Sequence, residues 1–262
     1  MWHLDGYDKL KPFGFAIHGA IDGYSRRILW LNVGPSNNDP RVIASYYLSC
    51  VQQNRGVPMI MRGDRGTENS HVAGIQRFLR RNSCDAFSGN DSFMYGRSVS
   101  NQRIEAWWSF LRKSETDWWI KFFKDLRDSG QFSDANPLQV DCIRFCFTPL
   151  IQAELNRVAR HWNLHKIRPS SNNESPPGRP DVLFFLPQLL NTADYKTPAP
   201  SDEIEIATEM CSTNGDETVQ GCEEFLDLAE LIMEDEGLNH PSTADEALVL
   251  YRKLVICFEK LL

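Results

Sequence analysis

The chain has 262 residues, of which 42% are hydrophobic, enough for one large domain or two modest ones. No apolar run approaches the roughly 18 residues of a membrane-spanning helix. Seven cysteines without short regular spacing argue against a disulfide framework. These features exclude membrane-spanning and disulfide-rich secreted proteins. We therefore expect no membrane partner, and a soluble protein of the nucleus or the cytoplasm with reduced thiols.

The net charge of −7 hides two oppositely charged regions. Residues 1–180 carry 24 Lys and Arg against 17 Asp and Glu, a net charge of +7, whereas residues 181–262 carry 4 against 18, a net charge of −14. A basic body can follow the phosphates of a nucleic acid, and an acidic tail can compete for the same surface. We expect the tail to contact the basic body or a protein partner, with simple solvation as the alternative.

Three strand candidates open the chain. Residues 2–6 form a short strand candidate that contains Asp5, and apolar runs cover residues 13–22 and 28–33. Asp22 and the glycine after it lie between these runs, and an Asp-Gly pair there is a strong hairpin signal. Asp22 is also a candidate metal ligand, but its turn position favours a structural role.

A helix and a fourth strand lead to an acidic loop. The Asp-Pro pair at residues 39–40 predicts a helix start, and apolar periodicity carries the helix to about residue 54. Residues 59–61 are predicted to form a strand, and residues 70–81 an amphipathic helix. Asp64 lies between them, at the carboxyl end of the strand. In sheets with crossover helices, ligands and reacting groups collect at that end.

The next segments complete the predicted sheet and begin a helical region. The apolar stub at residues 84–87 is predicted to be a fifth, edge strand. Residues 88–100 are rich in Gly, Ser and Asn and are predicted to form a mobile loop whose aromatic residues pack or stack on bases. A helix is expected over residues 101–113, and the aromatic residues of 118–123 continue its period and should be buried.

Composition divides the chain into four predicted regions. They are a core over residues 1–130, a helical extension over 131–193, a disordered acidic linker over 194–220 and a C-terminal helical pair over 221–262. The linker is rich in Pro, Thr, Ser and acids. The predicted fold class is α/β, with a five-stranded mixed sheet flanked by helices and a helical C-terminal appendage. The first three strands should be antiparallel.

One cysteine–histidine pattern is close to zinc-finger spacing. It comprises Cys142, Cys146, His161 and His165, in the order Cys-x₃-Cys-x₁₄-His-x₃-His. The residues around it have helical periodicity, and no turn residues lie between the cysteines. We therefore favour buried thiols in a helix over a zinc site.

Three acidic residues can converge from separate elements. Asp5 lies on the first strand, Asp64 follows the fourth strand, and Glu105 opens the helix at 101–113. Carboxylates and water are the ligands that Mg²⁺ and Mn²⁺ prefer. Phosphoryl transfer to DNA uses two such ions about 3.5–4 Å apart. The sequence therefore predicts a site with two Mg²⁺ or Mn²⁺ ions.

The surroundings of these acids suggest contacts with nucleic acid. Glu105, Ser109 and Arg112 share one helix face at i, i+4 and i+7, although a solvated face would have the same pattern. The predicted nucleic-acid-binding residues are Arg65, Asn101, Arg103, Ser109, Arg112 and Lys113.

Several motifs around these acids resemble the catalytic core of retroviral and retrotransposon-type integrases. The motifs are Trp2-x-x-Asp5, Asp22-Gly-Tyr-Ser25-Arg26, Asp64-x-Gly66-Thr67-x-Asn69, Asn101-x-x-x-Glu105 and, more loosely, Trp162-Asn163-x-His165-x-x-Arg168-Pro169. This is the D,D-E superfamily, which has a ribonuclease-H-like fold. The likeness covers about residues 2–115. It is closer still to integrase-core proteins of transposon-derived genes in animal genomes.

The resemblance implies roles for the three acids and a class of activity. Asp5 and Asp64 would each bind metal, with Asp5 bridging the ions, and Glu105 would complete the second ion site. DNA strand transfer and processing would follow, in the nucleus and by a homo-oligomer. The alternatives are a catalytically silent, domesticated core that binds nucleic acid or protein, and a ribonuclease-H-like nuclease, although the usual fourth carboxylate of that nuclease is missing from the motifs.

The sequence also departs from the family pattern. The interval between Asp64 and Glu105 is longer than usual, and Arg65 replaces a common Asn. Asp5 lies so near Met1 that we expect a shortened or fragmentary chain. No zinc-binding domain precedes the core motifs, and the acidic region at residues 181–262 is unlike the basic barrel of retroviral integrases.

Overall fold

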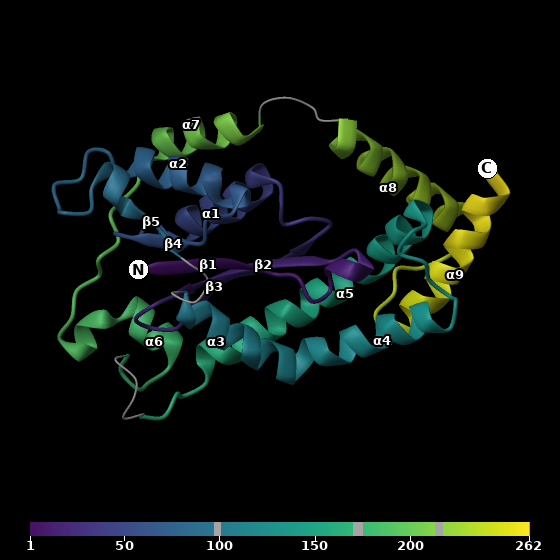
Figure 1. Ribbon diagram of the computed structural model, residues 1–262, viewed down its shortest axis with the longest axis horizontal. Helices are drawn as coiled ribbons and strands as arrows, with labels where there is room; N and C mark the ends of the chain where they lie inside the picture. The colour runs from purple at the N-terminus through teal and green to yellow at the C-terminus, as the bar shows by residue number, and fades with distance from the viewer. Residues whose placement is uncertain (97–100, 170–174, 213–216, 262) are drawn as a thin grey trace.

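The computed structural model describes residues 1–96, 101–169, 175–212 and 217–261. A central sheet has helices on both faces (Figure 1), with α1, α2 and α7 on one face and α3, α4 and α5 on the other. In chain order the helices are α1 (Pro40–Asn54), α2 (Ser70–Leu79), α3 (Gln102–Leu111), α4 (Asp117–Asp128), α5 (Pro137–Leu164), α6 (Pro180–Phe185), α7 (Ser201–Ser212), α8 (Glu217–Asp235) and α9 (Ala244–Leu261). Within the described ranges, no helix combines the length and apolar character needed to cross a membrane.

The sheet has five strands in the order β3-β2-β1-β4-β5. Their bounds are β1 (Trp2–Tyr7), β2 (Ala16–Asp22), β3 (Ile28–Gly34), β4 (Met61–Gly63) and β5 (Phe93–Tyr95). The first three strands are antiparallel, and β4 and β5 run parallel to β1. This mixed five-stranded sheet flanked by helices is the ribonuclease-H-like architecture that the sequence predicts.

The local signals for the hairpin and for α1 are confirmed. Asp22 Oδ2 accepts hydrogen bonds from the backbone N and the Oγ of Ser25, at 2.8 and 2.7 Å, so its carboxylate closes the β2–β3 turn. Asp39 caps α1 by accepting from Arg41 N at 2.8 Å, and Pro40 takes the first helical position. Asp22 therefore has the structural role that its turn position predicts.

The outer edge of β3 is satisfied by amide side chains of α5. Ile28 N donates to Asn163 Oδ1 at 2.8 Å, and Asn163 Nδ2 donates back to Ile28 O at 3.0 Å. Gln152 repeats the arrangement, accepting from Val33 N and donating to Leu31 O, both at 3.0 Å. An uncovered edge strand would present unpaired N–H and C=O groups to other chains. Part of the predicted helical extension thus completes the layer around the sheet.

Side-chain alternation along β1 separates two hydrophobic cores. Trp2 and Leu4 are buried in the core beneath α1, α2 and α7, whereas Tyr7 belongs to the core shared with α3, α4, α5 and α9. Successive strand residues point to opposite faces. Asp5 therefore shares its face with Tyr7 and is directed toward α3.

The fifth strand lies later in the chain than predicted. β5 is Phe93–Tyr95, inside the predicted loop, whereas residues 84–87 form a turn. Arg80 Nη2 donates to both carboxylate oxygens of Asp85, at 2.7 and 2.6 Å, and this ion pair fixes the turn. Phe87 is 37% exposed but Phe93 only 4%, so Phe93 is the residue that can pack beside β4. Residues 97–100 of the predicted loop lie outside the described residues.

Part of the predicted disordered linker is helical. α7 spans Ser201–Ser212 and buries Ile204 and Ala207 in the core beneath α1. Arg81, in the turn after α2, forms an ion pair with Glu203 at 2.7 Å, which ties the acidic region to the basic body. The acidic composition concealed an apolar i, i+3 pair, which is why the prediction of disorder is wrong for this segment. Residues 213–216 lie outside the described part of the chain.

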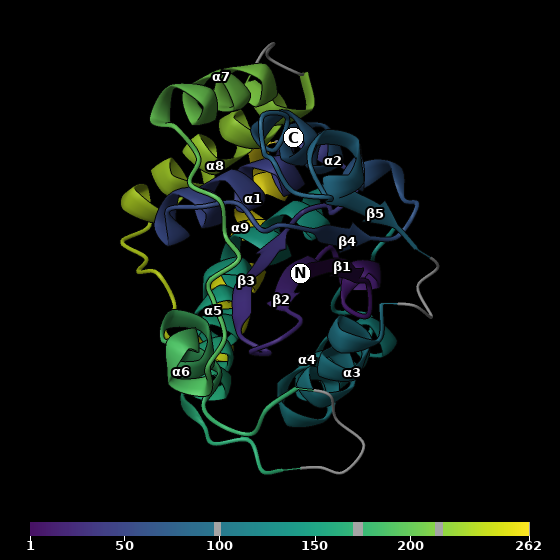
Figure 2. The same ribbon diagram turned by 90° about the vertical axis from the view of Figure 1, so that its left-hand side faces the viewer.

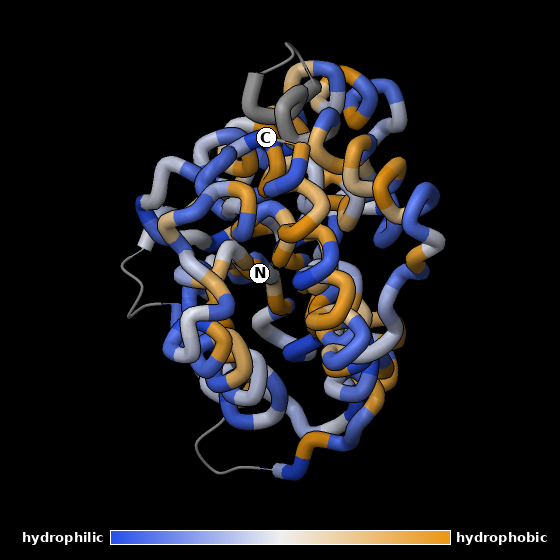
Figure 3. The backbone as a smooth tube through the Cα atoms, turned by 90° about the vertical axis from the view of Figure 1, so that its right-hand side faces the viewer, coloured by the Kyte–Doolittle hydropathy of each residue, from blue (hydrophilic) through white to orange (hydrophobic). Residues whose placement is uncertain are grey.

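The C-terminal helices α8 and α9, together with α3 and α4, complete the hydrophobic core that they share with α5. α9 buries Leu250, Tyr251 and Leu254 against α5, and Figure 3 shows hydrophobic and hydrophilic stretches alternating along the helices near the C-terminus. A π-helical turn at Arg112–Thr116 joins α3 to α4. The aromatic run beyond it is only partly buried, since Trp118 is 54% exposed. The prediction that the whole run is buried is wrong because one side of α4 faces solvent.

Candidate active site

Strand register brings two of the predicted acids to the same level of the sheet. β1 and β4 are parallel neighbours, with Trp2 opposite Met61 and His3 opposite Arg62. Continuing this register sets Asp5 level with Asp64. Adjacent strands lie about 4.7–4.9 Å apart. The fold therefore places these two residues on neighbouring chain segments at the carboxyl end of β4.

Asn101 attaches the start of α3 to β1 and so positions Glu105. Its Oδ1 is 2.9 Å from His3 Nδ1, and its Nδ2 donates to Leu4 O at 2.8 Å. Asn101 is 2% exposed, so it anchors the helix instead of contacting a nucleic acid, and its predicted role is corrected. Glu105 lies one turn further along α3 and is exposed.

The three acids interact electrostatically. Burial raises the pKa of the Asp5 carboxyl from its usual 3.8 to about 7, and the neighbouring charges of Glu105 and then Asp64 add to the rise. Hydrogen bonds from Trp108 Nε1, at 3.0 Å, and from the Gly6 backbone act in the opposite direction. Asp5 thus lies within electrostatic range of both Glu105 and Asp64.

A fourth acid lies beside Asp64. Asp64 Oδ1 accepts from Gly66 N at 3.1 Å and from Asn69 Nδ2 at 2.8 Å, and the same Asn69 nitrogen is 3.0 Å from Glu68 Oε1. Burial, then the Asp64 charge, raises the pKa of Glu68. The Glu68 carboxylate lies over Gly66, in the space that a Cβ at residue 66 would occupy. The predicted site did not include Glu68, although its place in the Gly-rich loop after Asp64 was a usable signal.

Comparison with known families decides the classification. The family model of the integrase core domain matches residues 1–194, which include all three acids. The chain belongs to the integrase core family. The resemblance to retroviral and retrotransposon-type integrases is confirmed, and at the level of the family the function is of the integrase or transposase type. Neither the curated proteins nor the solved structures give a match.

The acidic side chains of this integrase core have the chemistry that a hard divalent cation prefers, and they follow one another along the chain in the order of the family motifs. Asp5, Asp64, Glu105 and nearby Glu68 offer only carboxylate oxygens, as Mg²⁺ and Mn²⁺ prefer. Trp108 donates a hydrogen bond to Asp5 Oδ2, and Asn69 donates one to Asp64 Oδ1. Across the described ranges, no three His, Cys, Asp or Glu side chains are gathered tightly enough to hold an ion in their present orientations. The donor groups therefore have the chemistry of a cation site, without the close grouping of three described ligands that would hold an ion.

Most of the predicted nucleic-acid contacts lie on the surface. Arg65, Ser109, Arg112 and Lys113 are exposed, and Arg103 is half-buried. Ser109 Oγ donates to Glu105 O at 3.3 Å, which confirms that the two residues stack on one side of α3. Arg112 lies 3.9 Å from Asp117, a long contact that leaves much of its guanidinium accessible.

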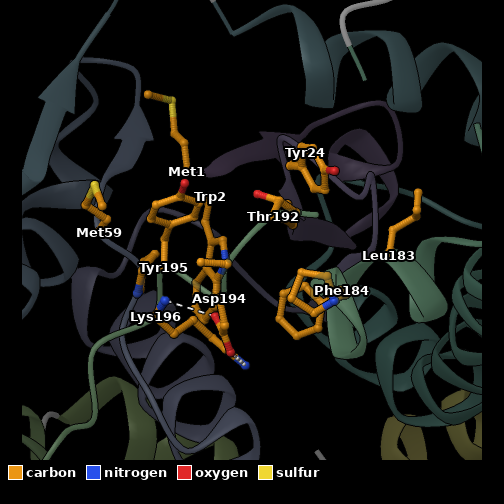
Figure 4. A pocket seen from close by; sticks show the side chains of 14 residues that line it. Met1, Trp2, Tyr24, Met59, Leu183, Phe184, Thr192, Asp194, Tyr195 and Lys196 are labelled. Atoms are coloured by element: carbon orange, nitrogen blue, oxygen red, sulfur yellow. Dashed lines mark hydrogen bonds and ion pairs between the residues drawn. The ribbon is translucent and has the colours of Figure 1, made fainter. Parts of the chain in front are cut away.

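A separate cavity lies at the opposite end of β1. It has a volume of about 140 Å³ and is bounded by the start of β1 and the segment between α6 and α7 (Figure 4). Lys196 Nζ lies 4.6 Å from the centre of the Phe184 ring and 3.4 Å from Asp194 Oδ2. The cavity thus holds a lysine of the chain itself. Figure 2, viewed toward the N-terminus, shows that the segment passes from α6 to α7 across this end of the sheet.

The cysteine–histidine pattern is part of α5. Cys142 and Cys146 are fully buried in its apolar face, and burial raises the pKa of both thiols, that of Cys142 to about 12. His165 Nδ1 lies 2.7 Å from Trp162 O at the end of the helix. The expectation of buried thiols in a helix is confirmed.

Proposed function

We propose that this chain is a Mg²⁺- or Mn²⁺-dependent polynucleotidyl transferase that processes and joins DNA strands. The observation that carries the proposal is the position of Asp5, which lies level with Asp64 in the β1–β4 register and is bonded by Trp108 of α3, the helix that carries Glu105. Burial and the charges of Glu105 and Asp64 raise the pKa of Asp5. Asp5 lies on β1, Asp64 follows β4 and Glu105 lies on α3, and the side chain that donates to Asp5 is the uncharged indole of Trp108. Such an arrangement is the kind that divalent cations stabilise.

The proposed roles follow from position. Asp5 would help to hold both cations, Asp64 would complete one ion site and Glu105 would complete the other. When bound, the ions supply activation of the attacking oxygen and stabilisation of the leaving oxygen. The exposed cations Arg65, Arg112 and Lys113 position the phosphates on either side.

DNA is the proposed substrate, and the nucleus the proposed compartment. The net charge of +7 over residues 1–180 supports contact with a polyanion, because a basic surface gains affinity by releasing counterions from DNA. We infer a homo-oligomer as the working form, since joining two DNA ends requires holding both. The acidic C-terminal region modulates this binding through its contacts with the body.

Cleavage and joining of labelled DNA by the purified chain test the proposal. The wild type should nick and join DNA with Mg²⁺ or Mn²⁺ and not with a chelator. Asp64→Asn should reduce both reactions to background with an unchanged circular dichroism spectrum. Asp91→Asn, which neutralises an exposed acid before β5, is the matched control and should leave both reactions intact. A silent wild type that still binds DNA would favour the domesticated binding module instead.

A ribonuclease-H-like activity is the second candidate function, and Glu68 is the observation that favours it. This residue adds a carboxylate beside Asp64 that the motifs alone did not include. The same preparation should therefore be offered an RNA–DNA hybrid of the same sequence. If the wild type preferentially hydrolysed the RNA strand and Glu68→Gln did not, the result would favour hybrid hydrolysis over strand transfer as the function.

A further inference from the structure

Two consecutive tryptophans on α3 have different surroundings. Trp107 and Trp108 are 2% and 5% exposed, so both rings are core residues. Among the described residues, the Trp107 indole N–H has no hydrogen-bond partner, and its ring packs edge-on against Trp162. The Trp108 indole N–H donates to Asp5 Oδ2 at 3.0 Å. Burial is common to both residues, and the bond to the acid belongs to Trp108.

The sheet provides a slot for the Trp108 ring. Gly19 on β2 lies directly opposite Asp5 on β1, and directly opposed residues share a face of the sheet. A Cβ at Gly19 would lie 2.9 Å from Trp108 Cη2 and 3.2 Å from Trp30 O, closer than side-chain atoms normally approach. Tyr7 closes the other side, with its ring centre 5.3 Å from that of Trp108. The indole therefore reaches Asp5 through a gap that exists because residue 19 has no side chain.

The same helix carries both an acid and the donor to a second acid. Glu105 and Trp108 are separated by three positions on α3 and so lie on neighbouring parts of its surface. Asn101 fixes the start of this helix to β1. Docking α3 on the sheet thus sets the position of Glu105 and the orientation of the Asp5 carboxylate together.

We propose that Trp108 is a positioning residue for Asp5, fixing Oδ2 and leaving Oδ1 to bind a cation, and that the absence of a side chain at Gly19 makes room for the Trp108 ring. The inference rests on the proposed function, in which Asp5 is a cation ligand. An indole N–H donates only and does not titrate, so it orients a carboxylate without competing for a cation. Partners that orient a metal ligand in this way typically contribute about 10–100-fold to metal affinity.

Metal affinity in two matched variants tests the proposal. Trp108→Phe keeps an aromatic ring and removes the N–H that bonds Asp5, whereas Trp107→Phe removes the N–H that has no partner. Mn²⁺ binding, followed by electron paramagnetic resonance of the free ion, should weaken by about 10-fold in Trp108→Phe and change by less than about twofold in Trp107→Phe. Gly19→Ala, with Trp108 intact, should weaken it in the same direction. In an Asp5→Asn background, Trp108→Phe should cause no further loss.

A metal-free measurement separates this proposal from the proposed function. In a ¹H–¹⁵N spectrum, the indole resonance that disappears in Trp108→Phe should shift on Asp5→Asn, while that of Trp107 should not. An unmoved Trp108 resonance, or equal Mn²⁺ affinity in the two phenylalanine variants, would overturn the positioning role and leave the proposed function standing. A wild type that binds no Mn²⁺ would refute the proposed metal site, and with it the role of Trp108 there.

Discussion

Polar side chains at two places on the same sheet differ in whether their hydrogen-bonding and charge requirements are satisfied. Along the edge of β3, Gln152 and Asn163 each donate one hydrogen bond to the strand backbone and accept another. Beside β1 and β4, Asp5 and Asp64 meet with Glu105 nearby, and the charges oppose one another. An amide side chain can donate and accept, whereas an ionised carboxylate only accepts. Adjacent carboxylates therefore need a proton or a cation, which suits them to function and not to scaffolding.

The β3 edge should be the more sensitive of the two to loss of a side chain. Asn163→Ala leaves the buried N–H and C=O of Ile28 without their amide partner, which should lower the free energy of unfolding by about 2–4 kcal/mol. Urea unfolding measures this change in the free energy of unfolding. Arg160→Ala, an exposed change on the same helix, should stay within about 0.5 kcal/mol. Equal stability of the two variants would show that water replaces the amide at no cost.

The acidic site should respond in the opposite direction, with a specific dependence on pH. Because the folded pKa of Asp5 is raised to about 7, the metal-free wild type loses stability as the pH rises from about 4 to about 7. Asp5→Asn lacks this loss, so its advantage over the wild type should grow across that window to the order of 4 kcal/mol and then level off. Denaturant unfolding at a series of pH values checks this, and a constant difference would contradict the assigned pKa.

The difference in stability between the wild type and Asp5→Asn separates the pH dependence that Asp5 causes from the pH dependence that the buried histidines cause. Burial lowers the pKa of His3 to about 4 and that of His18 to about 3. These groups stay neutral in the folded state, so their contribution to stability is lost as the pH falls below about 6.5. Their slope is opposite to that of Asp5, but it is shared by the wild type and Asp5→Asn and cancels in the comparison.

The smallest expected effect concerns the acidic C-terminal region. α9 is packed into the core, so deleting this region would expose apolar surface, and neutralising exposed acids is the cleaner change. Combining Asp227→Asn, Glu234→Gln and Asp235→Asn on α8 should tighten non-specific DNA binding a few-fold and steepen its salt dependence. Fluorescence anisotropy at several salt concentrations measures both quantities. Unchanged affinity and slope would assign these acids to solvation alone.

The sequence predicted those features that local pattern determines. The hairpin at Asp22 and the start of α1 at Asp39 followed from short-range signals, and the order of elements placed Asp5 near Asp64. The fifth strand was misplaced because Phe93 becomes a strand residue only through pairing with β4. α7 was missed because its two buried residues are hidden in an acidic segment.

The hydrogen-bond partners of the candidate site residues could not be predicted from local sequence patterns. Asn101 has the polar character of a nucleic-acid contact, and only the position of α3 on β1 shows that it is an anchor. The bond from Trp108 to Asp5 depends on the gap at Gly19, a residue on a different strand. Tertiary geometry decides which of two adjacent tryptophans meets the acid, and helical spacing does not.

The effect of Mg²⁺ on thermal stability tests most directly whether the three acids form one cation site. An ion that binds only the folded state at a hundredfold excess over its dissociation constant adds about 2.7 kcal/mol. We therefore expect a rise of very roughly 5–11 °C in the wild-type melting temperature, because about 1 kcal/mol corresponds to 2–4 °C for a domain of this size. In Asp5→Asn and Asp64→Asn the rise should shrink or vanish, while both variants melt higher than the metal-free wild type. A wild type indifferent to Mg²⁺ and Mn²⁺, with both substitutions lowering stability, would contradict the account.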